Sequence, residues 1–201
     1  VWYPAEVNTS IRPGWFYHES EDDKVKSLAE LLDIYFNSVG GNAAFLLNVP
    51  PDKRGLIHEN DVARLKEMGD YLSRLFEENL AEGAVFKPSV TAPGYEDSES
   101  YWRAPDSVEQ AEIEIDLGEE KQFDTVVLGE AIEIGQRIER FTLSALQDGE
   151  WQEIYSGTVV GYKKIGRFDP VTARHLRLSI TESRYFATLK QFELYLRPEN
   201  R

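Results

Sequence analysis

The hydrophobic pattern of this 201-residue chain changes its period once, in a stretch punctuated by glycine and proline between about residues 81 and 94. Before this stretch, apolar residues recur every three to four positions, as on one face of a helix. After it, apolar and polar residues alternate in short runs, as they do in strands. The change predicts an α/β domain over residues 1–82 followed by an all-β domain over residues 83–201.

The first domain is predicted to alternate strands with helices. The expected elements are strands at 1–7, Trp15–His18 and 43–49, a helix from near Glu21 to Gly40-Gly41, and a helix at 59–80. Residues 43–49 are nearly all apolar, which is typical of a strand buried on both faces of a parallel sheet. Ligands of parallel α/β folds bind at the carboxyl ends of the strands. We therefore expect Glu6, the Asn8–His18 loop and Asn48 to face the same side.

So few strands cannot close a barrel or cover both faces of a sheet, and they would leave strand edges unpaired. We expect these residues to complete a larger domain whose other strands lie on sequence not present in this chain. The chain also begins at Val1 without an initiator methionine or a charged leader, which is typical of a processed or incompletely represented polypeptide.

The second domain is predicted to be a β-sandwich. The expected strands lie at 111–117, 125–128, 140–146, 151–155 and 175–180. Asp148-Gly149 is a strong hairpin signal between two of them. Short strands at this spacing are typical of sandwiches of about 110 residues.

The charge balance excludes several partners. The chain has 22 Lys and Arg against 36 Asp and Glu, a net charge of -14, so attraction to nucleic acid or to an anionic membrane is not expected.

With no cysteine, the chain has no disulfide, thiolate metal site or cysteine nucleophile. No apolar run approaches the roughly 20 residues that span a bilayer.

Glu6 is the most distinctive acid, because it follows an apolar, aromatic strand rather than a solvated helix face. Burial among Trp2, Tyr3 and Trp15 would raise its pKa and suit it to proton donation. The alternative is a salt bridge with Arg12, which would lower the pKa instead. The other notable acids are interpreted as helix-start residues: Asp22, Asp23, Glu59 and Asp61.

Trp15 is either an apolar platform for a ligand or ordinary core. The histidines, His18, His58 and His175, lack metal-ligand spacing, and His58 is placed to cap the second helix. No phosphate-binding glycine loop, zinc signature or nucleophile elbow is present.

The aromatic residues of the second domain leave two alternatives open. Tyr101-Trp102-Arg103, Trp151 and Tyr162 could form a sugar-stacking surface. Core packing is the competing interpretation for Trp102 and Trp151, and it is the one we prefer.

Several long motifs, in order, resemble the C-terminal third of the catalytic domain of α-L-fucosidases of glycoside hydrolase family 29. They are Trp2-Tyr3-Pro4-Ala5-Glu6, Ser10-Ile11-Arg12-Pro13-Gly14-Trp15-Phe16-Tyr17-His18, Val39-Gly40-Gly41-Asn42 and Leu46-Leu47-Asn48-Val49-Pro50-Pro51-Asp52. Downstream, a further set resembles the coagulation factor 5/8 type C, or discoidin-like, module. This set is Ile115-Asp116-Leu117-Gly118, Gly135-Gln136-Arg137, Trp151, Val160-Gly161-Tyr162-Lys163-Lys164 and residues 174–178.

The resemblance implies the C-terminal portion of a (β/α)8-like barrel followed by a β-sandwich of the galactose-binding-like jelly-roll type. It implies a retaining hydrolase that releases terminal α-L-fucose from fucosylated glycans, using an aspartate nucleophile and a glutamic acid/base. The nucleophile motif of the family is not in this sequence, so the N-terminal remainder of the barrel is an expected partner. The alternative is a non-catalytic carbohydrate-binding or structural module.

Residue roles carry over from the same resemblance. Glu6 matches an acid/base position of some members, whereas the members most like this chain use an earlier glutamate. Trp15 matches an aromatic residue that packs on the fucose methyl group, and Trp2 and His18 are assigned to substrate binding with it. The shortened loop at 95–106 favours a docking role for the sandwich. No cofactor is implied for catalysis, a structural calcium ion in the sandwich is left open, and a secreted or periplasmic bacterial protein is implied.

Overall fold

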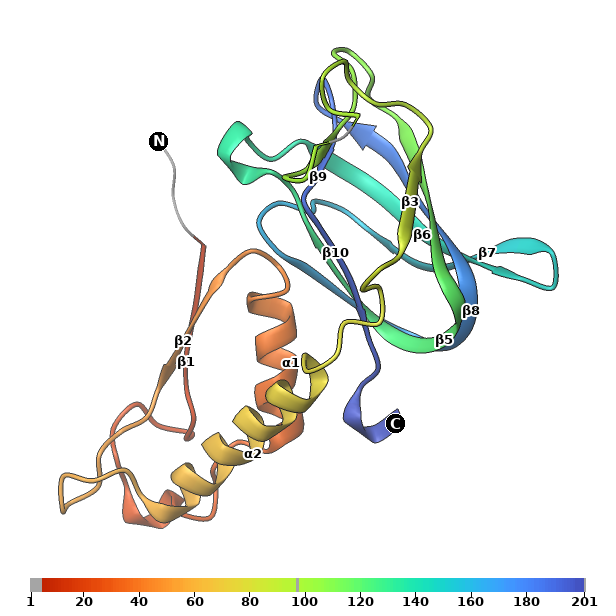
Figure 1. Cartoon of the computed structure of the whole chain (residues 1–201). Helices are drawn as coiled ribbons and strands as arrows, with labels where there is room; N and C mark the ends of the chain where they lie inside the picture. Colours follow the sequence, from red (N-terminus) through yellow and green to blue (C-terminus); the bar gives the residue numbers. More distant parts are fainter. Residues whose placement is uncertain (1–4, 97, 201) are drawn as a thin grey trace. The chain divides into compact units, whose positions relative to one another are not determined.

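A computed structural model describes residues 5–96 and 98–200 of the chain (Figure 1). Their contacts divide the chain into two compact units, one ending at Glu77 and the other beginning at Glu78. The first unit is α/β and the second is almost entirely β, as the change in hydrophobic period predicts.

The α/β unit contains two parallel strands with a helix after each. Strand β1 (Glu6–Ser10) pairs with β2 (Ala44–Asn48) in parallel, with Glu6 opposite Ala44 and Ser10 opposite Asn48. The crossover between them contains the 3-10 turn η1 (Glu19–Glu21) and helix α1 (Leu28–Ser38), and α2 (Glu59–Leu75) follows β2. A parallel pair requires such a crossover, so the predicted α/β order is confirmed.

The ends of several elements differ from the prediction. Strand β1 ends at Ser10 rather than at residue 7, so residues 8–10 belong to the strand and not to the predicted Asn8–His18 loop. Trp15–His18 is irregular backbone rather than a strand. Helix α1 begins at Leu28 rather than near Glu21, because Ser27 and Glu30 form a complete capping box that satisfies the free N–H groups of its first turn.

The second helix is also shorter than predicted, ending at Leu75 instead of Leu80. The backbone N–H of Leu80 donates to the carbonyl of Leu194 at 2.9 Å, so this segment joins the β unit. The competing hydrogen bond outside the helix explains the early end.

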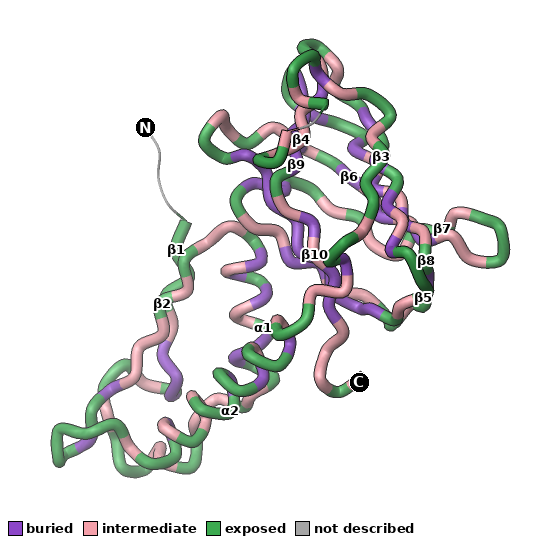
Figure 2. The backbone as a smooth tube through the Cα atoms, viewed as in Figure 1, coloured by how far each residue is buried: buried purple, intermediate pink, exposed green. Residues whose placement is uncertain are grey.

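Strand β2 is not buried on both faces, contrary to its apolar sequence. Ala44 and Leu46 are exposed, Leu46 by 50%, while Phe45 and Leu47, which alternate with them, are half-buried (Figure 2). Among the described residues β1 and β2 form a two-stranded sheet, so one of its faces lacks a covering layer. A strand with this composition is adapted to a larger sheet.

The β unit is built on one six-stranded antiparallel sheet in the order β10-β5-β8-β6-β7, with β3 also paired to β5. The strands are β3 (Val85–Pro88), β5 (Ala111–Gly129), β6 (Ile138–Gln147), β7 (Glu150–Gly157), β8 (Lys164–Ser183) and β10 (Gln191–Tyr195). A short pair, β4 (Trp102–Arg103) with β9 (Thr188–Leu189), and the 3-10 turns η2 (Ile132–Ile134) and η3 (Pro198–Asn200) complete the unit. The predicted β-sandwich is thereby confirmed.

A single strand of this unit, β5, takes the place of two predicted strands. Residues 111–117 and 125–128 both belong to β5, which continues through register shifts against β8 between Asp116 and Thr125 (Figure 1). Bulges of this kind bend long strands, so β5 and β8 curl around the core instead of ending in turns.

The core of the β unit comes from the inward positions of these strands, such as Ile113, Phe123, Leu143 and Leu176. Gly166 is required by this packing, because a Cβ atom there would lie 2.6 Å from the Tyr155 ring. The predicted hairpin is confirmed between β6 and β7.

Candidate active site

The loops that follow β1 and β2 leave the sheet at the same edge, because the two strands are parallel. Asn48, the last residue of β2, connects them: its Nδ2 donates to the carbonyl oxygen of Trp15 at 2.8 Å and to Ser10 Oγ at 3.2 Å. Trp15 is thus held at the carboxyl edge, where ligands of parallel α/β folds bind.

The side chains at this edge are unusually apolar for exposed residues. Trp15 is 47% exposed and Phe16 is 75% exposed, and His18 is also exposed. Within the described residues Trp15 is therefore not part of a core. The exposed indole can contact the C–H face of a sugar, and the exposed imidazole can donate or accept a hydrogen bond with a hydroxyl group.

Glu6 lies elsewhere. It stands opposite Ala44 at the amino end of β1, four residues from the carboxyl edge, or about 13 Å at roughly 3.3 Å per residue. The expectation that Glu6 faces the same side as Asn48 is wrong, and its side chain is exposed rather than buried among aromatic rings. Trp2, the other predicted site residue, lies outside the described residues.

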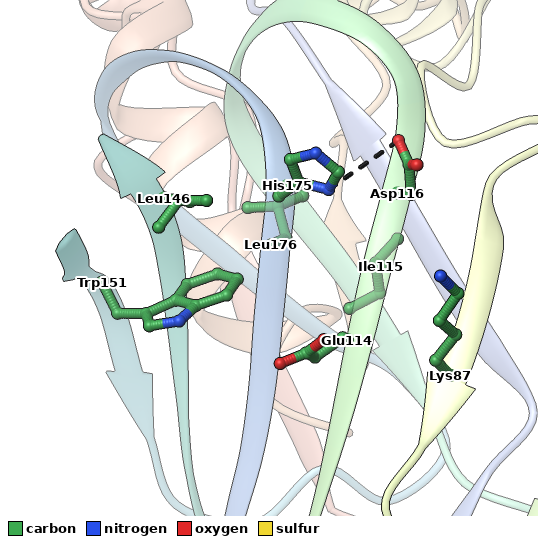
Figure 3. A pocket seen from close by; sticks show the side chains of 8 residues that line it. All are labelled: Lys87, Glu114, Ile115, Asp116, Leu146, Trp151, His175 and Leu176. Atoms are coloured by element: carbon green, nitrogen blue, oxygen red, sulfur yellow. Dashed lines mark ion pairs between the residues drawn. The ribbon is translucent and has the colours of Figure 1, made fainter. Parts of the chain in front are cut away.

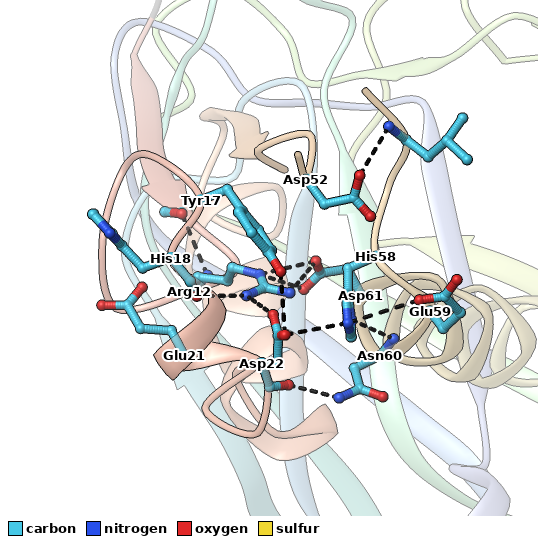
Figure 4. A network of polar contacts seen from close by, with 12 residues as sticks. Arg12, Tyr17, His18, Glu21, Asp22, Asp52, His58, Glu59, Asn60 and Asp61 are labelled. Carbon is cyan, nitrogen blue, oxygen red and sulfur yellow. Dashed lines mark hydrogen bonds and ion pairs between the residues drawn. The ribbon is translucent and has the colours of Figure 1, made fainter. Parts of the chain in front are cut away.

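Arg12, the predicted partner of Glu6, is instead the centre of a buried polar network (Figure 4). Its side chain and that of Asp61 are both 0% exposed; Arg12 Nε donates to Asp61 Oδ2 at 2.9 Å, and Nη2 lies 2.9 Å from the same oxygen. Arg12 Nη1 donates to Asp22 Oδ1 at 2.8 Å. The alternative of a Glu6–Arg12 salt bridge is therefore wrong.

The network fixes the charge states of its members. Burial alone lowers the pKa of Arg12, but the hydrogen bonds and charges of Asp61 and Asp22 outweigh it and raise that pKa. The hydrogen bond from Arg12 lowers the pKa of Asp22, and burial together with Asp22 raises the pKa of Tyr17. Arg12 and Asp22 are thus charged and Tyr17 neutral at neutral pH.

Asp22 connects the network to helix α2. Tyr17 Oη donates to Asp22 Oδ2 at 3.2 Å, and Asn60 Nδ2 donates to the Asp22 carbonyl at 2.7 Å. His58 Nε2 lies 3.4 Å from Asp22 Oδ2, while its Nδ1 accepts the backbone N–H of Asn60. The predicted capping role of His58 is confirmed.

The loop after β2 is organised by a second ion cluster. Arg54 donates two hydrogen bonds to Asp52 Oδ2, at 2.8 and 2.6 Å, and these lower the pKa of Asp52 to about 2. Because this folded-state pKa lies below the ordinary value, the contribution of Asp52 to stability is present above pH 4 and is lost as the pH falls towards 2. Lys53 Nζ donates to Glu19 at 2.8 Å across a hollow of about 280 Å³ between the two loops.

Sequence reasoning missed the Arg12–Asp61 pair, although one signal was available. Asp61 does lie in the first turn of α2, as a helix-start acid. It also shares the spacing of seven residues that places Met68 and Leu75 on the buried face of the helix. A carboxylate on an apolar face needs a buried cationic partner.

The β unit has a separate hollow, of about 220 Å³, on the outer face of its sheet (Figure 3). Trp151 lines it and is half-buried, with the Arg177 guanidinium 4.2 Å from the centre of its ring. The core interpretation is therefore wrong for Trp151, because this residue faces outward from β7. Trp102 is half-buried against the core, and its Nε1 donates to the carbonyl of Val90.

Residues 5–96 and 98–200 contain no group of three or more His, Asp or Glu side chains arranged to hold a metal ion. None of their helices is long and apolar enough to cross a membrane.

Two family models match the chain, one on each unit. The α-L-fucosidase model matches residues 3–77, and the F5/8 type C domain model matches residues 82–191. The fold and the matches define the class as part of an α-L-fucosidase α/β domain joined to an F5/8 type C β-sandwich. More specifically, the chain belongs to the α-L-fucosidases of glycoside hydrolase family 29.

Individual relatives agree with this assignment. The putative alpha-L-fucosidase 1 of Oryza sativa subsp. japonica is 38% identical over 195 residues, which cover 91% of this chain and 37% of the relative. A putative alpha-L-fucosidase structure from Bacteroides thetaiotaomicron is 34% identical with a TM-score of 0.91, covering 98% of this chain and 46% of that one. A Ruminococcus gnavus GH29 fucosidase in complex with fucose is 33% identical with a TM-score of 0.88, covering 99% of this chain and 42% of that one. The chain thus spans less than half the length of each of these relatives.

Proposed function

We propose that this chain is the C-terminal part of a retaining α-L-fucosidase that releases terminal α-L-fucose from fucosylated glycans. The observation that carries the proposal is the likeness, over nearly the whole chain, to a fucosidase whose structure contains bound fucose. The exposed Trp15 and His18 at the carboxyl edge of β1 and β2 support it, because they are suited to contact a sugar ring.

The catalytic nucleophile is proposed to lie on the remainder of the barrel. Retaining hydrolysis needs two carboxyl groups about 5 Å apart, one to attack the anomeric carbon and one to protonate the leaving oxygen. The exposed face of β2 supports such a remainder, since further strands of a barrel would cover Ala44 and Leu46. The share of each relative that the chain spans, below one half, supports it as well.

The proposal is tested by comparing the full-length protein with residues 1–201 alone. We expect the full-length protein to hydrolyse an aryl α-L-fucoside with retention of anomeric configuration, measured by NMR, and the isolated chain to show no turnover. Turnover by the isolated chain would contradict the proposed location of the nucleophile. An inactive full-length protein that still binds fucosylated oligosaccharides would favour the binding-module alternative.

Glu6→Gln in the full-length enzyme tests the acid/base role implied by the resemblance. From its place at the amino end of β1 we expect kcat/KM to change by less than about twofold, for an aryl fucoside and for a natural glycan alike. A proton donor would instead lose far more rate on the natural glycan, whose leaving group needs protonation. A loss of about 100-fold confined to the glycan would restore Glu6 as the acid.

A further inference from the structure

We propose that Arg12 is a positioning residue for fucose binding, which holds the loop of Trp15 and His18 in place through Asp61 and Asp22. This inference rests on the proposed fucosidase function. Arg12 itself is 0% exposed, so it cannot touch a substrate and acts only through the segment that it holds.

The loop after β1 needs such a support, because beyond the buried Ile11 at its root the burial of apolar side chains does not fix it. Residues 11–27 contain only the three-residue turn η1, and the side chains at the tip, Trp15 and Phe16, are exposed. The root of the loop is tied by backbone hydrogen bonds, from Ile11 to Asn48 and from Lys26 to Ile11, both at 2.9 Å. Ordering the segment beyond that root costs conformational entropy that other contacts must offset.

Arg12 supplies these contacts from within the loop. Its Nη1 donates to Asp22 and lies 3.5 Å from the His18 carbonyl oxygen, and its guanidinium lies 4.9 Å from the centre of the Tyr17 ring. It thus binds residues on the C-terminal side of Trp15, while Asn48 holds Trp15 itself. The His18 side chain points away from this network (Figure 4).

Asp61 connects the network to a rigid element. It lies in the first turn of the 17-residue helix α2, and its carboxylate receives Arg12 Nε at 2.9 and 3.2 Å. Asn60 in the same turn also binds the Asp22 backbone. Through these contacts the loop is anchored to helix α2.

The geometry requires arginine rather than any cation. One guanidinium bonds two carboxylates in different directions through its planar set of N–H donors. A lysine ammonium is a compact charge that cannot span both Asp61 and Asp22 with the same spacing. Arg12→Lys should keep the positive charge but lose the simultaneous contacts with Asp61 and Asp22.

The experiment compares Arg12→Lys with wild-type full-length enzyme, and uses Arg64→Lys, in a surface ion pair of α2, as the matched control. We expect Arg12→Lys to raise KM and the inhibition constant of L-fucose roughly tenfold, with kcat changed by less than about threefold, since small misplacements of binding groups have effects of this size or larger. Amide hydrogen exchange of residues 11–22 should accelerate. Arg64→Lys should leave KM, the inhibition constant, kcat and the exchange rate unchanged.

A second variant protects the test against loss of folding. Asp22 is 25% exposed, so Asp22→Asn weakens its contact with Arg12 by removing the negative charge and one acceptor oxygen, while the buried pair with Asp61 remains. We expect it to raise KM about threefold, in the same direction as Arg12→Lys.

The outcomes separate this inference from the proposed function. An active, folded Arg12→Lys enzyme with unchanged L-fucose inhibition and unchanged exchange in residues 11–22 would overturn the positioning role alone. Loss of thermal stability without any change in KM would do the same. A wild-type enzyme without fucosidase activity would overturn the proposed function, and this inference with it.

Discussion

Replacing Asp61 by alanine is expected to lower the free energy of unfolding of the α/β unit by about 3–5 kcal/mol. Asp61 and Arg12 are both fully buried, and the variant would leave the guanidinium of Arg12 with only Asp22 as a charged partner. A charge left without its buried partner retains its desolvation cost and loses the attraction that offset it. The effect should therefore exceed that of any single surface substitution.

Urea unfolding of the full-length protein, with hydrogen exchange of α2 to identify the unit that unfolds, measures this change. Asp70→Ala on an exposed face of the same helix is the control, and should alter stability by less than about 0.5 kcal/mol. Asp61→Asn should cost less than alanine, because the amide keeps one oxygen as an acceptor. Equal effects of Asp61→Ala and Asp70→Ala would contradict the energetic role of the buried pair.

Trp15→Ala is expected to lower kcat/KM for an aryl α-L-fucoside about 100-fold, which corresponds to about 2.7 kcal/mol. The indole offers a large apolar surface at the carboxyl edge, where Asn48 holds its backbone. Burying that surface against the C–H groups of a 6-deoxy sugar, together with the ring contact, supplies an energy of this order.

Specificity distinguishes this role from a general loss of activity. If the indole contacts the methyl group of fucose, Trp15→Ala should reduce the preference for an α-L-fucoside over the matching α-L-galactoside, which carries a hydroxyl group there. Tyr162→Ala, which removes an aromatic residue that is 71% exposed on the β unit, is the control and should leave both rates unchanged. An unchanged preference in Trp15→Ala would exclude contact with the methyl group.

The helix that follows the first loop shows why local signals were not sufficient. Ser20–Asp23 and Ser27–Glu30 both have the composition of a helix start, and the prediction placed the start at the earlier one. In the structure Asp22 serves Arg12 and Tyr17, and the capping box forms only at Ser27. The choice between two similar local signals depends on a partner that is remote in sequence, such as Asn60, whose side chain binds the Asp22 carbonyl.

The sequence by itself determined the features that depend on neighbouring residues. These are the change from a helical to an alternating period, the hairpin at Asp148-Gly149, the start of α2 behind His58 and the motifs of the fucosidase family. Only the tertiary structure decided the composition of the candidate site. The direction and register of β1 against β2 separate Glu6 from Trp15, and packing of the first loop on α2 brings together Arg12 and Asp61, 49 residues apart. Such pairings follow from strand register and burial across the fold, which no pattern within a few residues encodes.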